Sequence, residues 1–256
     1  MLTPTLFIGH GNPMYSIEKN EFSQTWEQLG KKLTIPSAII CISAHWETNG
    51  TELTAAVLPD TIHDFNGFPR KLFEVLYLPI GAPKLTHYIQ NTLPKENIVL
   101  NPHRGLDHGA WSILRNMYPE ANIPIIQLSI DRTKSPLEHY ELGKKLSFLR
   151  KENIMIIGSG NIVHNLYKVD FDNPQNAYSW AINANNMIKT LLKKNQSEAL
   201  INYKELGDDV QLAIPSPEHY IPLLYIQALR NDTDQLSFFN DKIELGSLSM
   251  TSFIFK

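Results

Sequence analysis

Short apolar runs alternate along the chain with longer stretches in which apolar residues recur at helical spacing. The apolar runs are rich in β-branched residues and predict strands over residues 5–8, 37–43, 53–58, 97–100, 123–130, 153–158 and 247–255. The helical patterns predict helices over residues 22–33, 70–77, 83–93, 109–118, 136–150, 176–194 and 218–229. Alternating strands and helices are typical of an α/β fold, whose central sheet is covered by helices on both faces.

The chain shows no sign of a division into separate domains. It has 256 residues, which is enough for a sizeable core, and no repeat, low-complexity tract or linker interrupts its pattern. We therefore predict that residues 1–256 form a single three-layer domain with a central sheet.

Composition narrows the class of protein. Hydrophobic residues make up 43% and charged residues 19%, as in a globular protein, and the net charge is −3 without a block of like charges, so nucleic acid is not an expected partner. The one cysteine, Cys41, lies in an apolar run and cannot form an internal disulfide, which fits a reducing cytoplasm. The N-terminus lacks a basic leader, and no apolar run approaches the ~20 residues that span a bilayer. We expect a cytoplasmic protein that does not interact with membranes.

Polar residues follow several of the predicted strands. His10 follows the first strand between Gly9 and Gly11, His45 follows the strand at 37–43, and Ser159, Gly160 and Asn161 follow the strand at 153–158. Ligands of open α/β sheets bind beyond the carboxyl ends of the strands. We therefore expect a binding or catalytic site at one edge of the sheet. The histidine between two glycines needs an explanation.

Two common types of site match this pattern poorly. The sequences "GHG" and "GSG" resemble the start of a nucleotide-binding loop, but Met14 and Val163 stand where its third glycine belongs. Ser159 could be the nucleophile of a serine hydrolase, yet Ile157 replaces the first glycine of the G-x-S-x-G motif.

A metal centre explains the histidines better. Neutral imidazole binds iron and zinc well, and a catalytic metal needs about three protein ligands with positions left open. Glycine beside a ligand lets backbone and substrate approach the metal. The histidines in glycine-rich or tightly turned contexts are His10, His45, His108, His164 and His219.

Seven motifs in order along the chain are together specific to one family. They are "GHGNPM", "SAHWET", "IHDFNGFP", "RGLDHGAW", "PIIQLSID", "GSGNIVHNL" and "PSPEHYIPLLY". The chain thus resembles the DOPA 4,5-dioxygenase family of class III extradiol ring-cleavage dioxygenases, which is similar to the catalytic subunit of protocatechuate 4,5-dioxygenase. The resemblance runs from residue 8 to about residue 225, nearly the whole chain.

The resemblance implies an α/β domain with a mixed central sheet and a metal at one sheet edge. It implies Fe(II) as the cofactor, with Zn able to occupy the same site. By motif, His10, His45 and His219 match metal ligands; protocatechuate enzymes have a glutamate at the third position, so the adjacent Glu218 is the alternative there. His164 matches an acid–base histidine that can also be a fourth ligand, and His108 matches a histidine involved in proton transfer.

The implied activity is cleavage of a catechol ring beside its hydroxyls, with O2, to a muconic semialdehyde. An L-DOPA-like catechol cut at the 4,5 position is the implied substrate, and the small catechol and O2 are the expected partners. Two alternatives stand beside this hypothesis: a zinc-dependent hydrolase that uses the same histidines, and a non-enzymatic binding protein on the same fold.

Some neighbouring residues have less certain roles. Arg104 either pairs with a substrate carboxylate or lies at the surface, and His63 either contacts substrate or is structural. Asp64 is expected to cap its own loop. His87 and His139 lie in lysine-bearing helical stretches and are expected to be solvated, whereas Trp46 and Phe65 belong to a pocket wall or the core.

Overall fold

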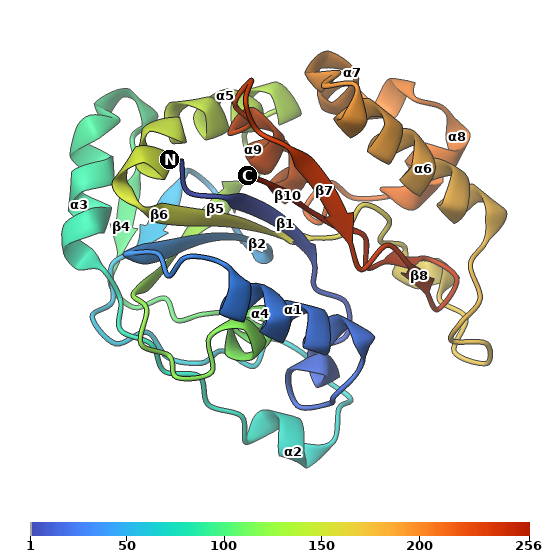
Figure 1. Cartoon of the computed structure of the whole chain (residues 1–256), viewed down its shortest axis with the longest axis horizontal. Coiled ribbons are helices and arrows are strands. Elements are labelled where there is room, and N and C mark those ends of the chain that lie inside the picture. The colour runs from blue at the N-terminus through green and yellow to red at the C-terminus, as the bar shows by residue number, and fades with distance from the viewer. Residues whose placement is uncertain (1) are drawn as a thin grey trace.

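A computed structural model describes residues 2–256, which form an α/β fold around a large mixed sheet (Figure 1). Its eight strands lie in the order β4-β3-β5-β2-β6-β1-β10-β7. In chain order the strands are β1 (Thr5–Gly9), β2 (Ala38–Thr48), β3 (Glu52–Thr54), β4 (Val99–Asn101), β5 (Ile125–Asp131), β6 (Ile154–Gly160), β7 (Leu236–Phe239) and β10 (Ser252–Phe255). A second, two-stranded sheet pairs β8 (Ile243–Glu244) with β9 (Leu248–Ser249).

The middle of the large sheet is parallel and ends at a common edge. Strand β6 pairs in parallel with β1 on one side and β2 on the other, and β2 pairs in parallel with β5. Gly9 lies opposite Gly160, and Ser43 lies opposite Ser159. The residues that follow β1 and β6, together with the end of β2, therefore meet at the same edge, as the sequence predicted.

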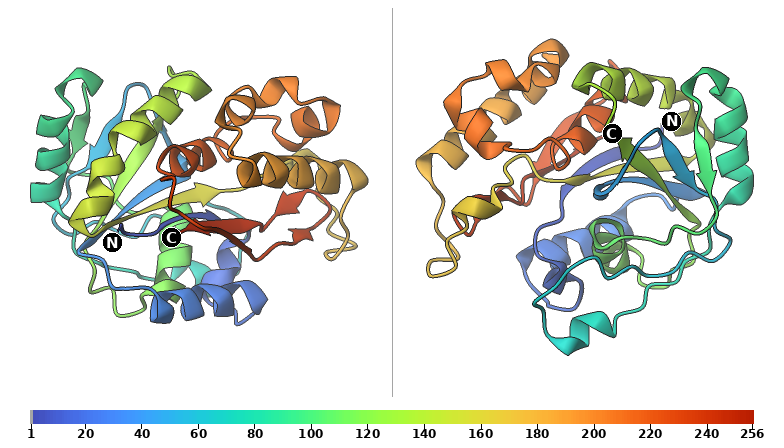
Figure 2. Two further views of the ribbon diagram at one scale, coloured as in Figure 1. Left: turned by 45° about the horizontal axis from the view of Figure 1, so that its top comes forward. Right: turned by 180° about the vertical axis from the view of Figure 1, so that it is seen from behind.

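Helices cover both faces of the sheet (Figure 2). The bounds of the α-helices are α1 (Glu21–Lys32), α2 (Arg70–Phe73), α3 (Pro83–Thr92), α4 (His108–Met117), α5 (Pro136–Lys145), α6 (Ser179–Lys193), α7 (Ser197–Ile201), α8 (Asp208–Ala213) and α9 (Ile221–Ala228). Helices α5 and α9 pack on one face, and α1 and α4 pack on the other. Short 3₁₀ helices are η1 (Pro13–Ser16), η2 (Pro94–Glu96), η3 (Ser147–Glu152), η4 (Leu166–Lys168) and η5 (Tyr203–Glu205).

Alternation along β2 separates two apolar cores. Ile40 and Ile42 point into the core beneath α5 and α9, whereas Ile39 and Cys41 point into the core beneath α1 and α4. Both sets are essentially inaccessible to solvent. A continuous apolar run is what a strand covered on both faces requires.

The sequence contains the signals that start several helices. Asn20 and Ser23 form a capping box at α1, and Ser135 and Glu138 form another at α5, where Pro136 occupies the first turn. Asp107 caps α4 by accepting a hydrogen bond from the backbone N–H of Ala110. This cap fixes the start of the helix whose first residue is His108.

Several predicted boundaries were wrong. Strand β2 continues past residue 43 to Thr48, strand β3 ends at Thr54 rather than 58, and the predicted strand at 247–255 is divided into β9 and β10. The helix predicted over 70–77 ends at Phe73, and no regular secondary structure follows until α3. Helices α7 and α8 and strands β7 and β8 lie outside the predicted elements. None of the described helices is both long and apolar enough to cross a bilayer.

His139 is a correction to the sequence-based expectation. It was expected to be solvated, but it is buried, and its Nδ1 lies 2.9 Å from the hydroxyl of Tyr225 in α9. The lysines that suggested an exposed face lie on the other side of α5. His87, by contrast, is exposed as expected.

Candidate metal centre

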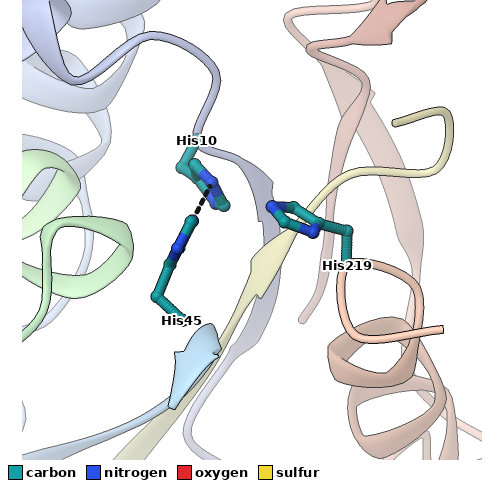
Figure 3. Close-up of side chains that lie close together, drawn as sticks. All are labelled: His10, His45 and His219. Atoms are coloured by element: carbon teal, nitrogen blue, oxygen red, sulfur yellow. Dashed lines mark hydrogen bonds between the residues drawn. The ribbon is translucent and has the colours of Figure 1, made fainter. Parts of the chain in front are cut away.

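Three segments far apart in the sequence meet at the carboxyl edge of the sheet. His10 follows β1, and its backbone N–H donates to the carbonyl oxygen of Gly160 at 3.3 Å. His45 lies near the end of β2, within the register shift between Ile42 and Glu47. His219 precedes α9, and its carbonyl oxygen accepts from the backbone N–H of Asn161 at 2.9 Å. Figure 3 shows the three imidazoles turned toward one another.

The glycines around these histidines allow close packing of the backbone. A Cβ on Gly9 would lie 2.8 Å from the backbone of Met250, and a Cβ on Gly160 would overlap the carbonyl oxygen of His219. Gly11 has φ +58°, in the left-handed region that favours glycine. His10 thus stands between two glycines because the chain turns sharply there while it passes under Met250.

The three imidazoles bring one nitrogen each to a common point. Nε2 of His45 lies 3.0 Å from Nε2 of His10 (Figure 3). The ring of His219 is centred 5.3 Å from that of His10 and 5.1 Å from that of His45. The three residues offer nitrogen atoms within 4.8 Å of one another.

The outer nitrogen of His10 is held by a hydroxyl group. Ser159 Oγ donates to the carbonyl oxygen of Gly109 at 2.6 Å, so it accepts from Nδ1–H of His10, 3.0 Å away. With its proton on Nδ1, His10 has a free lone pair on Nε2. A hydrogen bond to the outer nitrogen is the usual device that fixes the tautomer of a metal-binding histidine.

A carboxylate lies beside the outer nitrogen of each of the other two histidines, within hydrogen-bond distance only at His219. Nδ1 of His45 lies 3.6 Å from Asp64 Oδ2, and Nδ1 of His219 lies 3.1 Å from Glu218 Oε1. Nε2 of His219 is buried and has no hydrogen-bonding partner in the described part of the chain. Three lone pairs directed at one point, one of them buried without a partner, fit a cation.

Burial keeps these imidazoles in the form that binds metals. It lowers the pKa of His10 and of His219 well below 6.5, and the neighbouring histidines add to the effect. Burial and the neighbouring His108 also lower the pKa of His45, to about 3, although Asp64 and Glu218 oppose the change. All three rings are therefore neutral at neutral pH.

His108 and Asp64 form a pair beside His45. Oδ1 of Asp64 accepts from the backbone N–H of His108 at 2.9 Å and from its Nδ1 at 3.0 Å. Burial alone would raise the pKa of Asp64, but these hydrogen bonds outweigh it and lower the pKa to about 2. Asp64 therefore does more than cap its own loop, because its two oxygens face two histidines.

His164 lies flat against His219. The ring centres are 3.4 Å apart and the planes differ by 8°. Burial lowers the pKa of His164 to about 4, with Glu218 opposing the change. A nitrogen of His164 lies within 4.8 Å of a carboxylate oxygen of Glu218 and a nitrogen of His219, and His164 does not belong to the group formed by His10, His45 and His219. The structure thus brings His10, His45 and His219 to one point and places His108 and His164 at its sides.

A cavity of about 410 Å³ opens onto these five histidines. Its apolar wall is formed by Phe65, Phe68, Leu166, Val169, Phe171, Leu245 and Leu248. Asn161 also lines it, and because its Nδ2 donates to the carbonyl oxygen of Ser249, its Oδ1 is left buried without a partner. The cavity suits a flat, mostly apolar molecule with hydroxyl groups at its histidine end.

Other candidates from the sequence have structural roles. Arg104 reaches the carbonyl oxygen of His45 at 3.3 Å and the carboxylate of Asp107 at 3.5 Å, and it lies over the ring of Trp46 outside the cavity lining. His63 lies 3.0 Å from the carbonyl oxygen of Val75. Ser159 is engaged by His10 and Gly109, which leaves no arrangement suited to a serine nucleophile.

Sequence reasoning missed the residues that orient the histidines. Ser159 was considered only as a nucleophile and Asp64 only as a loop cap, and Asn161 and Phe68 received no role. Of these residues, Asp64 could most easily have been predicted, because it lies beside a histidine in a motif that also contains two phenylalanines. Contacts such as that of Ser159 with His10, 149 positions apart, leave no local signal.

Comparisons with known proteins agree with this geometry. The family described as the catalytic LigB subunit of aromatic ring-opening dioxygenase matches residues 4–235. The 4,5-DOPA dioxygenase extradiol of Escherichia coli K12 is 42% identical over 253 residues, which cover 97% of this chain and 93% of that protein. The protein of the same name from Beta vulgaris is 34% identical, covering 98% and 96% of the two chains. A crystal structure of an uncharacterized protein from Escherichia coli K12 superposes with a TM-score of 0.87 at 37% identity, covering 99% of this chain and all of that one.

Proposed function

Because the chain belongs to the family of catalytic LigB subunits of aromatic ring-opening dioxygenases, we propose that it opens the ring of a DOPA-like catechol, with Fe(II) held by His10, His45 and His219. It is an extradiol dioxygenase, an enzyme that depends on a metal ion and that acts on a small aromatic substrate and O2. The hydrolase and binding-protein alternatives find no support in these relatives.

The choice of these three ligands rests mainly on the arrangement of their Nε2 atoms. The Nε2 atoms of His10 and His45 face each other at 3.0 Å, and the buried Nε2 of His219 has no protein partner. Each of the three rings has its other nitrogen beside an oxygen of Ser159, Asp64 or Glu218. In this arrangement Glu218 orients His219, so we favour His219 over Glu218 as the ligand.

The choice of Fe(II) rests on the reaction. Three neutral imidazoles suit both iron and zinc, so the donor set alone does not distinguish the two metals. When bound, Fe(II) supplies open positions for the catechol oxygens and O2, together with the redox chemistry that ring opening by O2 requires. Zn can occupy the same donors but has no redox chemistry.

The remaining residues position the substrate and move protons. The apolar wall, with Phe65 and Phe68, holds the aromatic ring and excludes water from it. His164 lines the cavity against the ring of His219, where a neutral imidazole can accept a proton from a catechol hydroxyl. Asp64 holds Nδ1 of His108, so the other nitrogen of that ring is free to face a substrate oxygen. We assign acid–base catalysis to His164 and a supporting proton-transfer role to His108.

The proposed substrate is named from the relatives. The proteins from Escherichia coli and Beta vulgaris are both named 4,5-DOPA dioxygenase extradiol. Cleavage of a DOPA-like ring beside its hydroxyls would give a muconic semialdehyde. A cytoplasmic location is proposed with it, on the ground that Cys41 is free and buried.

Reconstitution with metal tests the proposal. Metal-free protein is loaded under anaerobic conditions with Fe(II) or, in parallel, with Zn(II), and O2 uptake is then followed with a panel of catechols. We expect catechol-dependent O2 uptake and a yellow product with the Fe(II) form only. Absence of uptake with every catechol, at full iron occupancy, would contradict the proposed function.

A further inference from the structure

We propose that Glu218 selects catechols whose ring substituent carries an ammonium group, and that the cavity discriminates against catechols whose only charged group is a carboxylate. The inference rests on the proposed function and adds the charge of the substrate side chain to it. It concerns the end of the substrate that does not react.

The charges around the cavity have one sign. Among the described residues that line it, Glu218 is the one carboxylate, and neither lysine nor arginine is present. Arg104 is the guanidinium beside His45, but it is committed to the carboxylate of Asp107 and to the face of Trp46. A substrate carboxylate would therefore enter the cavity without a cationic partner, beside an anion.

Only one of the two carboxylate oxygens of Glu218 makes hydrogen bonds to other described residues. Its Oε1 accepts hydrogen bonds from Ser216 Oγ at 2.9 Å and from Nδ1 of His219 at 3.1 Å. Its Oε2 makes no hydrogen bond within the described part of the chain. The carboxylate is held in place by one oxygen and can receive an ammonium group with the other.

Glu218 also lies on the wall of the cavity onto which the histidines open. Nδ1 of His219 faces Glu218, which leaves Nε2 on the opposite side of the ring for the cluster of His10, His45 and His219. The carboxylate is thus one imidazole width from the cluster, on the wall of the same cavity. A catechol whose hydroxyls face the cluster carries its substituent a comparable ring width away.

A matched set of substrates separates the two charges of DOPA. Dihydrocaffeate is DOPA without the amine, dopamine is DOPA without the carboxylate, and 4-ethylcatechol has neither. With the Fe(II) enzyme we expect kcat/KM for dopamine and DOPA to exceed that for dihydrocaffeate by about 10- to 100-fold, the range of a hydrogen bond to a charged group. Anaerobic titration, in which no turnover occurs, should show the same order in Kd.

Variants of two carboxylates locate the effect. Glu218→Gln keeps an oxygen that can accept from His219 but removes the charge, so in the iron-loaded variant the ratio of kcat/KM for dopamine to kcat/KM for dihydrocaffeate should fall toward one. Glu47→Gln removes a carboxylate that feels the charge of Glu218 but lies outside the cavity lining, and it should change the preference by less than about 2-fold.

The outcomes distinguish this inference from the proposed function. If none of the four catechols is cleaved, 4-ethylcatechol included, the proposed function fails. If 4-ethylcatechol is cleaved and dihydrocaffeate reacts as well as DOPA, the charge selection alone is overturned. Should Glu218→Gln lose its iron, the wild-type substrate series and its anaerobic Kd values decide the matter by themselves.

Discussion

Each histidine of the proposed metal centre depends on a different kind of oxygen. His10 has a serine hydroxyl, His45 an aspartate and His219 a glutamate at or near its Nδ1 atom. All three therefore present Nε2 to the same point. Loss of one of these oxygens would leave the ligand present but free to change tautomer or rotate, which typically weakens metal binding about 10- to 100-fold.

Removing a ligand itself should cost more than removing its support. In His45→Ala we expect iron to be lost, with affinity reduced more than about 100-fold and activity lost in parallel. Metal content by elemental analysis and O2 uptake on the same samples check this. His103→Ala, which alters an exposed histidine, is the control, and full iron occupancy in His45→Ala would contradict the assignment.

His164→Ala tests the acid–base assignment. The variant should keep its iron and its affinity for catechol while kcat falls by about 10²- to 10⁴-fold, because it lacks the group that accepts the proton. Single-turnover rates and anaerobic Kd values separate the two effects. An unchanged kcat would remove His164 from the mechanism, and loss of iron would instead make it a ligand.

The identity of the site residues could be predicted better than their contacts. Their glycine-rich or tightly turned contexts singled out His10, His45, His108, His164 and His219, and the family resemblance matched three of them, His10, His45 and His219, to metal ligands; the structure places these three together. That His219 stacks on His164, or that Ser159 holds His10, depends on chain segments with no fixed spacing. Such contacts exist only after the sheet has formed.

At the scale of elements, strand ends decide where the site lies. The sequence predicted most of the strands that carry it, because apolar β-branched runs are a strong signal. It placed the end of β2 five residues too early, since the register shift that carries His45 interrupts the apolar pattern. Helices α7 and α8 were missed because they are short and only partly apolar, and their packing rather than their pattern stabilises them.

Gly160→Ala tests the close contact between β6 and the segment before α9. The added methyl group would overlap the carbonyl oxygen of His219, so that segment must move and carry the imidazole with it. We expect iron affinity to fall at least about 10-fold and stability to fall by about 1–3 kcal/mol. Isothermal titration with Fe(II) and urea unfolding measure the two effects.

A second crowded glycine provides the control for that experiment. A methyl group on Gly143 in α5 would press on Ala228 and Tyr225 of α9, far from the histidines of the cluster. Gly143→Ala should therefore lose stability and keep its iron affinity. If Gly160→Ala also binds iron normally, the contact with His219 does not position the ligand.

At the scale of the whole molecule, a buried ion pair joins three distant segments. Arg150 is 1% exposed; it donates to the carbonyl oxygens of Thr3 and Leu229 and pairs with Asp234 through two hydrogen bonds of 2.6 and 2.9 Å. Its guanidinium thus connects the N-terminal segment, the end of α9 and the turn before β7. Nothing in the sequence indicated this buried ion pair, because an arginine in a basic stretch is usually at the surface.

Arg150→Met should destabilise the fold by about 3–5 kcal/mol, since Asp234 would be left with a buried and unpaired charge. Urea unfolding of the metal-free protein measures this. Lys144→Met, which breaks an exposed pair with Glu141, should cost less than about 1 kcal/mol. Equal effects of the two substitutions would show that the buried pair is not a principal support.

Stability should also depend on pH through His139. Burial lowers the pKa of this histidine to about 4, whereas an unfolded histidine titrates near 6.5. Between these values the unfolded state binds the additional proton, so stability falls as pH falls from about 6.5 to about 4, by at most about 3 kcal/mol from this group.

In metal-free protein the cavity histidines also make stability fall as pH falls. The contribution of His139 to this pH dependence can be separated from theirs. His139→Gln removes the titrating group and keeps a polar partner for Tyr225. Its stability, measured by urea unfolding at a series of pH values, should fall less steeply with acid than that of the wild type. Parallel curves for the two proteins would contradict the assignment.

The sheet joins the two ends of the chain beside the candidate metal centre. Strand β1 pairs with β10, and the backbone of Met250 lies against Gly9, next to His10. While the protein is being synthesised, His10 leaves the ribosome first, but His219 and strand β10 follow more than 200 residues later. A nascent chain therefore cannot assemble the three-histidine site until His219 and strand β10 have been synthesised, and a metal ion can be bound by all three histidines only after that.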